Sequence, residues 1–413
     1  MQNLISVQEA QTRILSTIIA VSSEMELIEN SLNRILADNI RSSMDIPSSD
    51  LSSMDGFAVR NSDIRNAGKE TPVTLKVIDD IPAGKRSGKI IHPGQAARIM
   101  TGAELPIGGD TVIPFEQISG MDNLNDINPP NHIVVYSEFS IGANVRVRGE
   151  DINKETLLFC KNHKLRPQDI GILAMMGHQS VNVFSRPRIG IFSTGDELEV
   201  PGKALQPGKI YESNSFMLAA LSEKFGAHPL RMGKASDDAS EIKNVLDQFI
   251  EMKVDMILSS GGVSVGTHDV VRQVILEGGN VEFWKVNIKP GKPLLFGNYQ
   301  GIPFFGLPGN PVSSYISFLV FTLPAIRKSL CLPPLEKNCI KAVLEHPVKS
   351  DGRESYLRVK LRKIDGIYYA NYSSHQGSAN LLSLVQSDAL LIIPSGVKSL
   401  SAGTDVDAWL IHN

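Results

Sequence analysis

Three short glycine-containing turns, each placed directly after an apolar run, constrain the fold of this 413-residue chain more than any other feature. They are residues 193–197 (STGDE), 259–266 (SSGGVSVG) and 306–311 (GLPGNP). Helical patterns such as SFMLAALSEKF and HDVVRQVILEG separate the apolar runs. Strands that alternate with helices predict a doubly wound α/β domain with a parallel sheet. We assign residues 187–331 to this domain.

The segments on either side of residues 187–331 differ from this domain in their sequence pattern. Ser6 and Glu9 form a capping box, and helical spacing continues through Leu32, Ile35 and Ile40, so a helical domain is predicted over residues 1–45 and 144–186. Between these parts, short β-rich runs alternate with Gly, Pro, Asn and Asp, which predicts an inserted β domain over residues 46–143 with a variable loop at MDNLNDINPPN. Residues 332–413 form a further β-rich segment.

Composition excludes several classes of protein. With 41 basic and 44 acidic residues the net charge is -3, so no nucleic-acid partner is expected. The longest apolar stretch, residues 315–326, is interrupted by Ser and Pro and is too short to span a bilayer, and the first residues lack a signal-peptide pattern. Three dispersed cysteines without a CxxC fit reduced thiols. We therefore expect a cytoplasmic protein with no membrane partner.

The three glycine turns predict anion binding. Ligands of open α/β sheets bind at the carboxyl ends of the strands, where glycine lets backbone N–H groups approach an anion. No GK[ST] follows the glycines, so none of the turns is a P-loop of the Walker A type. The competing interpretation is that they are ordinary tight turns between strands and helices.

Charged residues near these turns indicate a metal-assisted phosphate site. Lys285, Lys289 and Lys292 are spaced by prolines and a glycine that fix the backbone between them, and lysine is an effective phosphate binder. Mg²⁺ prefers one or two carboxylates together with phosphate oxygens. The candidate carboxylates are Asp151, Glu197, Asp237 and Asp269. A solvated lysine cluster and helix-capping carboxylates remain the alternatives, above all for Asp237.

Two segments of the inserted domain carry further polar residues. SSMDGFAV contains Asp55, and IMTGA contains Thr101. Taken alone, both segments have the residue types that are common in turns. His268 beside Asp269 invites a general-base role, but no third group supports it.

Taken in order, SMDGFAV, IMTGAELP, NVRVRGEDI, STGDEL, SGGVSVG, KPGKPLLFG and LPGNPVS resemble the molybdopterin molybdenumtransferase family, which includes the C-terminal domain of gephyrin. The resemblance extends from about residue 5 to the C-terminus. It implies a multidomain α/β plus β fold. The doubly wound α/β domain binds molybdopterin, a split β domain lies between the two segments of the N-terminal helical domain, and the C-terminal domain is β-barrel-like. The resemblance also implies a homodimer whose active site is shared between subunits.

The implied reaction inserts molybdate into adenylyl-molybdopterin, with Mg²⁺-dependent release of AMP, to give molybdenum cofactor. By resemblance, the catalytic residues are Asp55, Thr101, Asp151, Glu197, Lys285 and Lys289. The implied ligand-binding residues are Arg146, Asp237, Ser260, Gly261, Gly262, Ser264, Gly266, Pro308, Pro311, Arg358 and Ser378. The implied Mg²⁺ ligands are Asp269 and Glu197. Many members carry an acid where this chain has Thr267, which leaves the number of metal-binding carboxylates open.

Two other functions compete with the transferase. One is Mg-ATP-dependent adenylylation of molybdopterin, which uses a similar α/β domain but typically that domain alone. The other is a non-enzymatic scaffold or cofactor carrier. The resemblance further implies contacts with the molybdopterin adenylyltransferase and with molybdoenzymes.

Overall fold

The computed structural model describes residues 4–119, 128–263, 270–372 and 376–411, and the chain divides into two compact units. Unit 1 comprises residues 1–37, 164–166 and 180–413, and unit 2 comprises residues 38–163 and 167–179. Each unit has apolar cores of its own. No helix of the described part is long and apolar enough to cross a membrane.

Within the described residues, unit 1 contains a six-stranded sheet in the order β16-β13-β17-β21-β20-β18. Four of its strands are parallel: β16 (His228–Ala235), β13 (Arg188–Thr194), β17 (Met256–Ser260) and β21 (Ile302–Leu307). The other two strands form antiparallel pairs: β20 (Pro293–Tyr299) with β21, and β18 (Gly279–Lys285) with β20, so β20 runs opposite to both of its neighbours. The predicted parallel sheet is thus confirmed for four strands, while the short turn at Gln300 and Gly301 between β20 and β21 leaves no room for a crossover helix.

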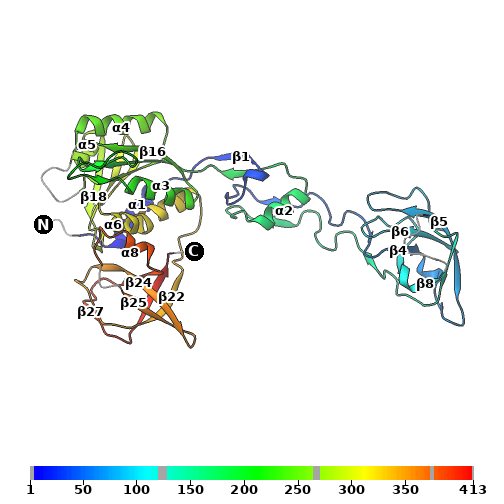
Figure 1. Cartoon of the computed structure of the whole chain (residues 1–413). Coiled ribbons are helices and arrows are strands. Elements are labelled where there is room, and N and C mark those ends of the chain that lie inside the picture. Colours follow the sequence, from blue (N-terminus) through cyan, green and yellow to red (C-terminus); the bar gives the residue numbers. More distant parts are fainter. Residues whose placement is uncertain (1–3, 120–127, 264–269, 373–375, 412–413) are drawn as a thin grey trace. The chain divides into compact units, whose positions relative to one another are not determined.

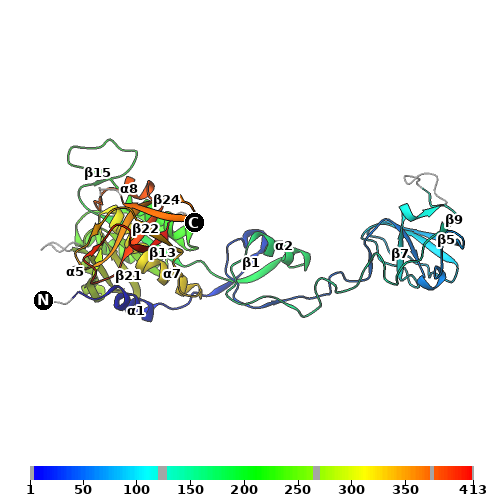
Figure 2. The ribbon, with the colours of Figure 1, turned by 90° about the horizontal axis from the view of Figure 1, so that it is seen from below.

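Helices cover both faces of this sheet (Figure 1). One face carries α4 (Ala239–Glu251) and α5 (Val270–Gly278); the other carries α1 (Val7–Thr17), α3 (Asn214–Lys224), α6 (Pro311–Ser317) and α7 (Leu323–Ser329), with α1 beside α7 (Figure 2). Along β13, Ile189 and Ile191 enter one core and Phe192 enters the other, because successive side chains of a strand point to opposite faces. Both cores are therefore anchored on the same strand.

The N-terminal segment confirms one predicted helix and refutes the next. Ser6 caps α1 by accepting a hydrogen bond from the Glu9 backbone N–H at 3.0 Å. The helix expected around Leu32, Ile35 and Ile40 does not form. The segment follows β1 (Ser23–Leu27) and the 3₁₀ turn η1 (Ile28–Asn30), and it consists of a turn, isolated β-bridges at Ile35 and Leu36, and the start of β2 (Ile40–Arg41). Asn33 has a φ of 64°, which interrupts a helix, and β-bridges to distant residues satisfy the backbone instead.

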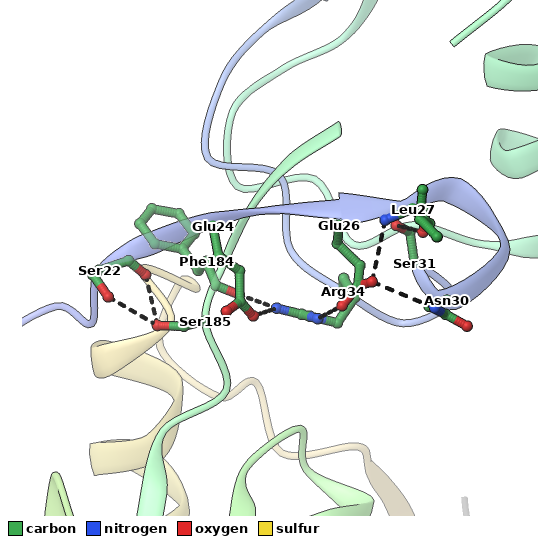
Figure 3. Close-up of polar contacts among 9 residues, drawn as sticks. All are labelled: Ser22, Glu24, Glu26, Leu27, Asn30, Ser31, Arg34, Phe184 and Ser185. Atoms are coloured by element: carbon green, nitrogen blue, oxygen red, sulfur yellow. Dashed lines mark hydrogen bonds and ion pairs between the residues drawn. The ribbon is translucent and has the colours of Figure 1, made fainter. Parts of the chain in front are cut away.

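A buried arginine secures the ribbon that β1 forms with β12 (Ser180–Phe184) (Figure 3). The Arg34 side chain is 6% exposed, forms ion pairs with Glu24 and Glu26, and donates to the Phe184 carbonyl at 2.9 Å. It thereby joins both strands of the ribbon through a single planar group.

The C-terminal part of unit 1 is a closed barrel. Its strands are β22 (Cys339–Leu344), β24 (Glu354–Ile364), β25 (Ile367–Tyr372), β26 (Ala389–Ile393) and β28 (Asp405–Leu410). β24 pairs with both β25 and β26, which closes the sheet and confirms the barrel-like prediction. β19 (Ile288–Lys289) joins the barrel by pairing with β24, so the lysine-rich segment is attached to it.

Unit 2 is built on the predicted β segment. Its described sheet has the order β7 (Thr111–Pro114), β4 (Gly56–Val59), β6 (Gln95–Ile99), β5 (Val73–Ile81), β9 (His132–Val135) and β8 (Ile118–Ser119). Unit 2 also contains β3 (Leu51–Ser52), β10 (Val145–Arg146), β11 (Leu157–Phe159) and α2 (Pro167–Met175). Most of the predicted variable loop, residues 121–127 of 121–131, lies outside the described residues.

Candidate functional site

The three glycine turns line one cavity of about 620 Å³ at the carboxyl ends of β13, β17 and β21. These strands are neighbours in the sheet, so Ser193 pairs with Ser260, and Ser260 pairs with Leu307. Parallel strands in register bring their carboxyl ends to one edge, as the strand and helix pattern predicts. The sequence-predicted residues on its wall are Glu197, Asp237, Ser260, Gly261, Gly262, Pro308 and Pro311.

Glycine suits the backbone conformation of two of these turns, and at Gly261 it is also required for steric reasons. Gly261 has a φ of +93°, and a Cβ there would lie 2.3 Å from the Thr194 carbonyl oxygen. Gly195 has a φ of +149°, and a Cβ there would lie 2.5 Å from a carboxylate oxygen of Glu197. At Gly261 the backbones of adjacent turns therefore approach more closely than any side chain would permit, whereas the flexible Glu197 side chain could move away from a Cβ at Gly195.

Two residues that the sequence interpretation overlooked hold the turns together. Asn214, at the start of α3 and 8% exposed, donates through Nδ2 to Ser260 Oγ at 2.8 Å and to the Gly309 carbonyl at 2.7 Å. Glu212, 3% exposed, accepts from Ser193 Oγ at 2.8 Å and from the Ser215 backbone N–H at 2.7 Å. Both residues line the cavity. A Glu-Ser-Asn run at the start of a helix is typical of helix capping. Only its position beside the sheet distinguishes these residues from ordinary capping residues.

The cavity has an acidic rim. Partial burial raises the pKa of Asp237 above its ordinary value, and the negative charges of Asp196 and Glu197 raise it further. The Asp237 backbone N–H lies 3.4 Å from Asp196 Oδ1. Three carboxylates near one another without a cation carry excess negative charge, which a hard divalent ion would offset. Glu197 and Asp237 therefore fit Mg²⁺ chemically, although the described residues contain no preformed cluster of three or more metal-ligand side chains.

A second cavity, of about 600 Å³, shares Pro293, Pro308 and Asn310 with the first. Its basic wall consists of Lys289, Lys292, Lys349, Arg353 and Arg358, and Ser378 lies beside them. Asp351 is 3.5 Å from Lys289 and is also paired with Arg353, whose hydrogen bonds hold the pKa of that carboxyl well below its usual range.

Arg358 is the most deeply buried cation of the second cavity. It is 1% exposed, and its guanidinium donates to Ser383 Oγ at 2.9 Å and to the Gly377 carbonyl at 3.1 Å. Burial lowers its pKa from the usual arginine value. These contacts fix the direction of the guanidinium, and they connect it to the segment that carries Ser378.

The remaining predicted residues are located as follows. Lys285 ends β18 and is not part of either cavity wall. In unit 2, the Asp55 carboxylate accepts from the Thr101 backbone N–H at 2.7 Å and from Thr101 Oγ1 at 2.8 Å. Also in unit 2, Arg146 and Asp151 form an ion pair. The residues that lie outside the described part are Ser264, Gly266, Thr267, His268 and Asp269.

Comparison with known proteins agrees with this arrangement. Residues 5–177 match the MoeA N-terminal region (domain I and II), residues 190–328 a probable molybdopterin binding domain, and residues 341–411 the MoeA C-terminal region (domain IV). A crystal structure of the molybdopterin biosynthesis MoeA protein from Pyrococcus horikoshii superposes with a TM-score of 0.85 at 33% identity and 99% coverage of both chains. Fold and site together therefore define a multidomain protein of the MoeA class.

Individual relatives identify the family. A molybdopterin molybdenumtransferase from Nostoc sp. is 38% identical over 380 residues, which cover 90% of this chain and 85% of the relative. Molybdopterin molybdenumtransferase 2 from Mycobacterium tuberculosis is 34% identical, with 98% of this chain and 99% of the relative covered. The chain belongs to the molybdopterin molybdenumtransferase family.

Proposed function

We propose that this chain is a molybdopterin molybdenumtransferase that converts adenylyl-molybdopterin and molybdate into molybdenum cofactor, with Mg²⁺-dependent release of AMP. The observation that carries the proposal is the pair of adjoining cavities, one rimmed by carboxylates and the other walled by cations. The two substrates need both kinds of surface: the phosphoanhydride of adenylyl-molybdopterin needs carboxylates that hold Mg²⁺, and the molybdate oxyanion needs cations. The names of the relatives support the same reaction.

In this proposal the first cavity binds the phosphoanhydride. The Gly261-Gly262 turn lines the phosphate site, its Gly261 N–H donates to the Leu307 carbonyl at 3.1 Å, and Asn214 keeps the two adjacent turns in place. Glu197 and Asp237, with Asp269, hold Mg²⁺, which supplies charge neutralisation at the phosphates. Most of the acceleration comes from fixed charges and dipoles, as is usual in phosphoryl chemistry.

The second cavity binds molybdate in the proposal. Lys289 and Arg358 offset the charge of the oxyanion, and Ser378 adds a hydroxyl donor. A molybdate oxygen attacks the adenylyl phosphorus, the bond from that phosphorus to the bridging oxygen breaks, and the pterin phosphate is the leaving group. The two dithiolene thiols then form two Mo–S bonds; the Mo–O bond to the adenylyl group breaks to release AMP, and a second molybdate oxygen leaves as water with the two thiol protons. Molybdenum is then retained by the dithiolene of the pterin.

We further propose that the unit 2 residues Asp55, Thr101, Arg146 and Asp151 act on the substrate from a second copy of the chain in a homodimer. The hydrogen bonds between Asp55 and Thr101 fix one carboxylate, and the ion pair of Arg146 with Asp151 fixes another. Carboxylates whose orientation is fixed in this way are better suited to contact a substrate than freely rotating surface carboxylates are.

The deciding experiment follows AMP release from adenylyl-molybdopterin and Mg²⁺, with and without micromolar molybdate. Molybdate-dependent AMP with metal retained on the pterin supports the transferase. Binding without AMP release at any molybdate concentration would instead support a carrier. Consumption of ATP on free molybdopterin would support an adenylyltransferase.

A further inference from the structure

Asp351 is a carboxylate that contacts two of the cations in the wall of the second cavity. No Asp or Glu is among the described residues that line this cavity, in contrast to the acidic rim of the first. Asp351 Oδ2 lies 2.6 Å from Nη2 of Arg353 and 3.5 Å from Nζ of Lys289. The two cations come from different segments, because Lys289 is in β19 and Arg353 precedes β24. One carboxylate therefore connects two parts of the cavity wall.

The two contacts of Asp351 differ in firmness. Arg353 Nε donates to both carboxylate oxygens, at 3.2 and 3.1 Å, and Nη1 donates to the Ile288 carbonyl at 3.2 Å. The Lys289 ammonium has only the long contact with Asp351 among the described ion pairs, and its side chain is 44% exposed. An exposed ion pair of this length is weak. Arg353 is therefore fixed to Asp351, whereas Lys289 can leave it easily.

The backbone keeps Lys289 within reach of both Asp351 and the cavity. β19 pairs with the start of β24, where Lys289 lies opposite Ser355, and the Glu354 backbone N–H donates to the Asn287 carbonyl at 3.3 Å. Lys289 also lines the cavity, so only its side chain must move to exchange one partner for the other. An oxyanion in the cavity and the Asp351 carboxylate therefore compete for the same ammonium group.

The charge of Asp351 opposes anion binding. The hydrogen bonds from Arg353, together with the charge of Lys289, hold the pKa of Asp351 well below its usual range, so the carboxyl is ionised at neutral pH. A dianion must take Lys289 from Asp351 and is also repelled by the carboxylate. The competing interpretation is that Asp351 strengthens binding by orienting the cations. The long, exposed contact with Lys289 orients that side chain little, so we expect the charge to dominate.

We propose that Asp351 is an internal counter-ion of the second cavity, which pairs with Lys289 while the cavity is empty and is displaced from it by a tetrahedral dianion. The identity of that dianion as molybdate rests on the proposed function. Asp351 pairs with Lys289 again once the molybdenum has passed to the dithiolene. The counter-ion therefore lowers the affinity of the cavity for oxyanions and favours their release.

The test is calorimetric binding of sodium molybdate to the full chain at low ionic strength. Asp351→Asn keeps the shape of the side chain and one acceptor oxygen but removes the charge, and it should tighten the molybdate Kd by about fivefold. The matched control is Asp407→Asn, which removes an exposed carboxylate of β28 that is paired with Lys341 at 2.8 Å. Neither of these two residues lines a cavity described above, so the control should leave the Kd unchanged.

Two further measurements separate the competition for Lys289 from a general charge effect. In a Lys289→Met background, Asp351→Asn should tighten binding by only about twofold, because the repulsion of the dianion remains but the competition is gone. The tightening should also shrink at an ionic strength of about 0.5 M, because exposed charges are screened there.

Unchanged or weaker molybdate binding by folded Asp351→Asn would overturn the counter-ion, and weaker binding would show that Asp351 only orients the cations. If Asp351→Asn does not fold, Asp351→Ser removes the same charge, and the same results decide. Sodium sulfate, another tetrahedral dianion, separates this inference from the proposed function. Tighter sulfate binding by Asp351→Asn, in a chain that does not bind molybdate, would support the counter-ion and contradict the transferase. Molybdate-dependent AMP release by the wild type would support the transferase even if the Asp351 variants bind no more tightly.

Discussion

The backbone conformation of Gly261 determines the shape of the first cavity at that point of its wall. Its positive φ and its approach to the Thr194 carbonyl both exclude a side chain. Gly261→Ala should lower the free energy of unfolding by about 3 kcal/mol and abolish AMP binding, because one of two adjacent turns must move. Urea denaturation and calorimetry measure the two effects.

Gly202 provides the matched control for this prediction. Its φ of +96° is close to that of Gly261, but a Cβ there would meet no atom within 4 Å. Gly202→Ala should therefore cost only the conformational penalty of about 1 kcal/mol. Equal destabilisation by the two substitutions would contradict a steric role for Gly261.

Asp237 should destabilise the fold when it is ionised. Its folded-state pKa is raised above 3.8 by burial and by nearby carboxylates, so the free energy of unfolding falls as the pH rises from about 3.8 to the folded-state pKa. Asp237→Asn should therefore increase the free energy of unfolding at neutral pH without metal, and the gain should vanish below about pH 3.8, where the wild-type carboxyl is protonated in both states. Thermal unfolding as a function of pH measures this gain. A gain that grows as the pH falls would refute the assignment.

At the scale of elements, Asn214 couples the start of α3 to the turns after β17 and β21. Asn214→Asp keeps the shape of the side chain but places a carboxylate oxygen against the Gly309 carbonyl. We expect a loss of about 2 kcal/mol in the free energy of unfolding and a higher KM. Asn244→Asp, on an exposed position of α4, is the matched control and should change neither quantity. Equal effects of the two substitutions would refute the coupling.

The β1–β12 ribbon depends on Arg34. Arg34→Met removes the partner of Glu24 and Glu26 and leaves the Phe184 carbonyl with one donor fewer (Figure 3). The free energy of unfolding should fall by about 2 kcal/mol. This is less than the cost of breaking a fully buried ion pair, because both carboxylates are partly exposed and can be hydrated. Arg13→Met breaks an exposed ion pair with Glu9 and should cost less than about 0.5 kcal/mol. Urea denaturation that ranks the two variants in the reverse order would exclude this role for Arg34.

At the scale of the whole molecule, the proposed homodimer makes a complementation prediction. Asp55→Asn in unit 2 and Glu197→Gln in unit 1 should each block AMP release. A heterodimer of the two variants, purified through two different tags, should regain about half of the wild-type activity, since one of its two shared sites is intact. No recovery would show that each site uses residues of one copy, and failure to isolate a heterodimer would refute the dimer.

Much of the site could be read from the sequence because its signals are local. An apolar run followed by glycine places a turn at the end of a strand, so the residues around Gly195, Gly261 and Gly309 could be assigned to one sheet edge. The reversed direction of β20 could not be predicted, because an apolar run does not encode its direction. Asn214 and Glu212 were overlooked because their partners, Ser260 and Ser193, are distant in sequence.

The sequence by itself determined the alternation of strands and helices, the capped start of α1, the β-rich inserted and C-terminal segments and the resemblance to a family, since each depends on residue order and spacing. Tertiary structure alone decided which charges gather around which cavity. It also replaced the helix expected near Ile35 with strand pairings, because long-range backbone partners outweigh a weak local propensity.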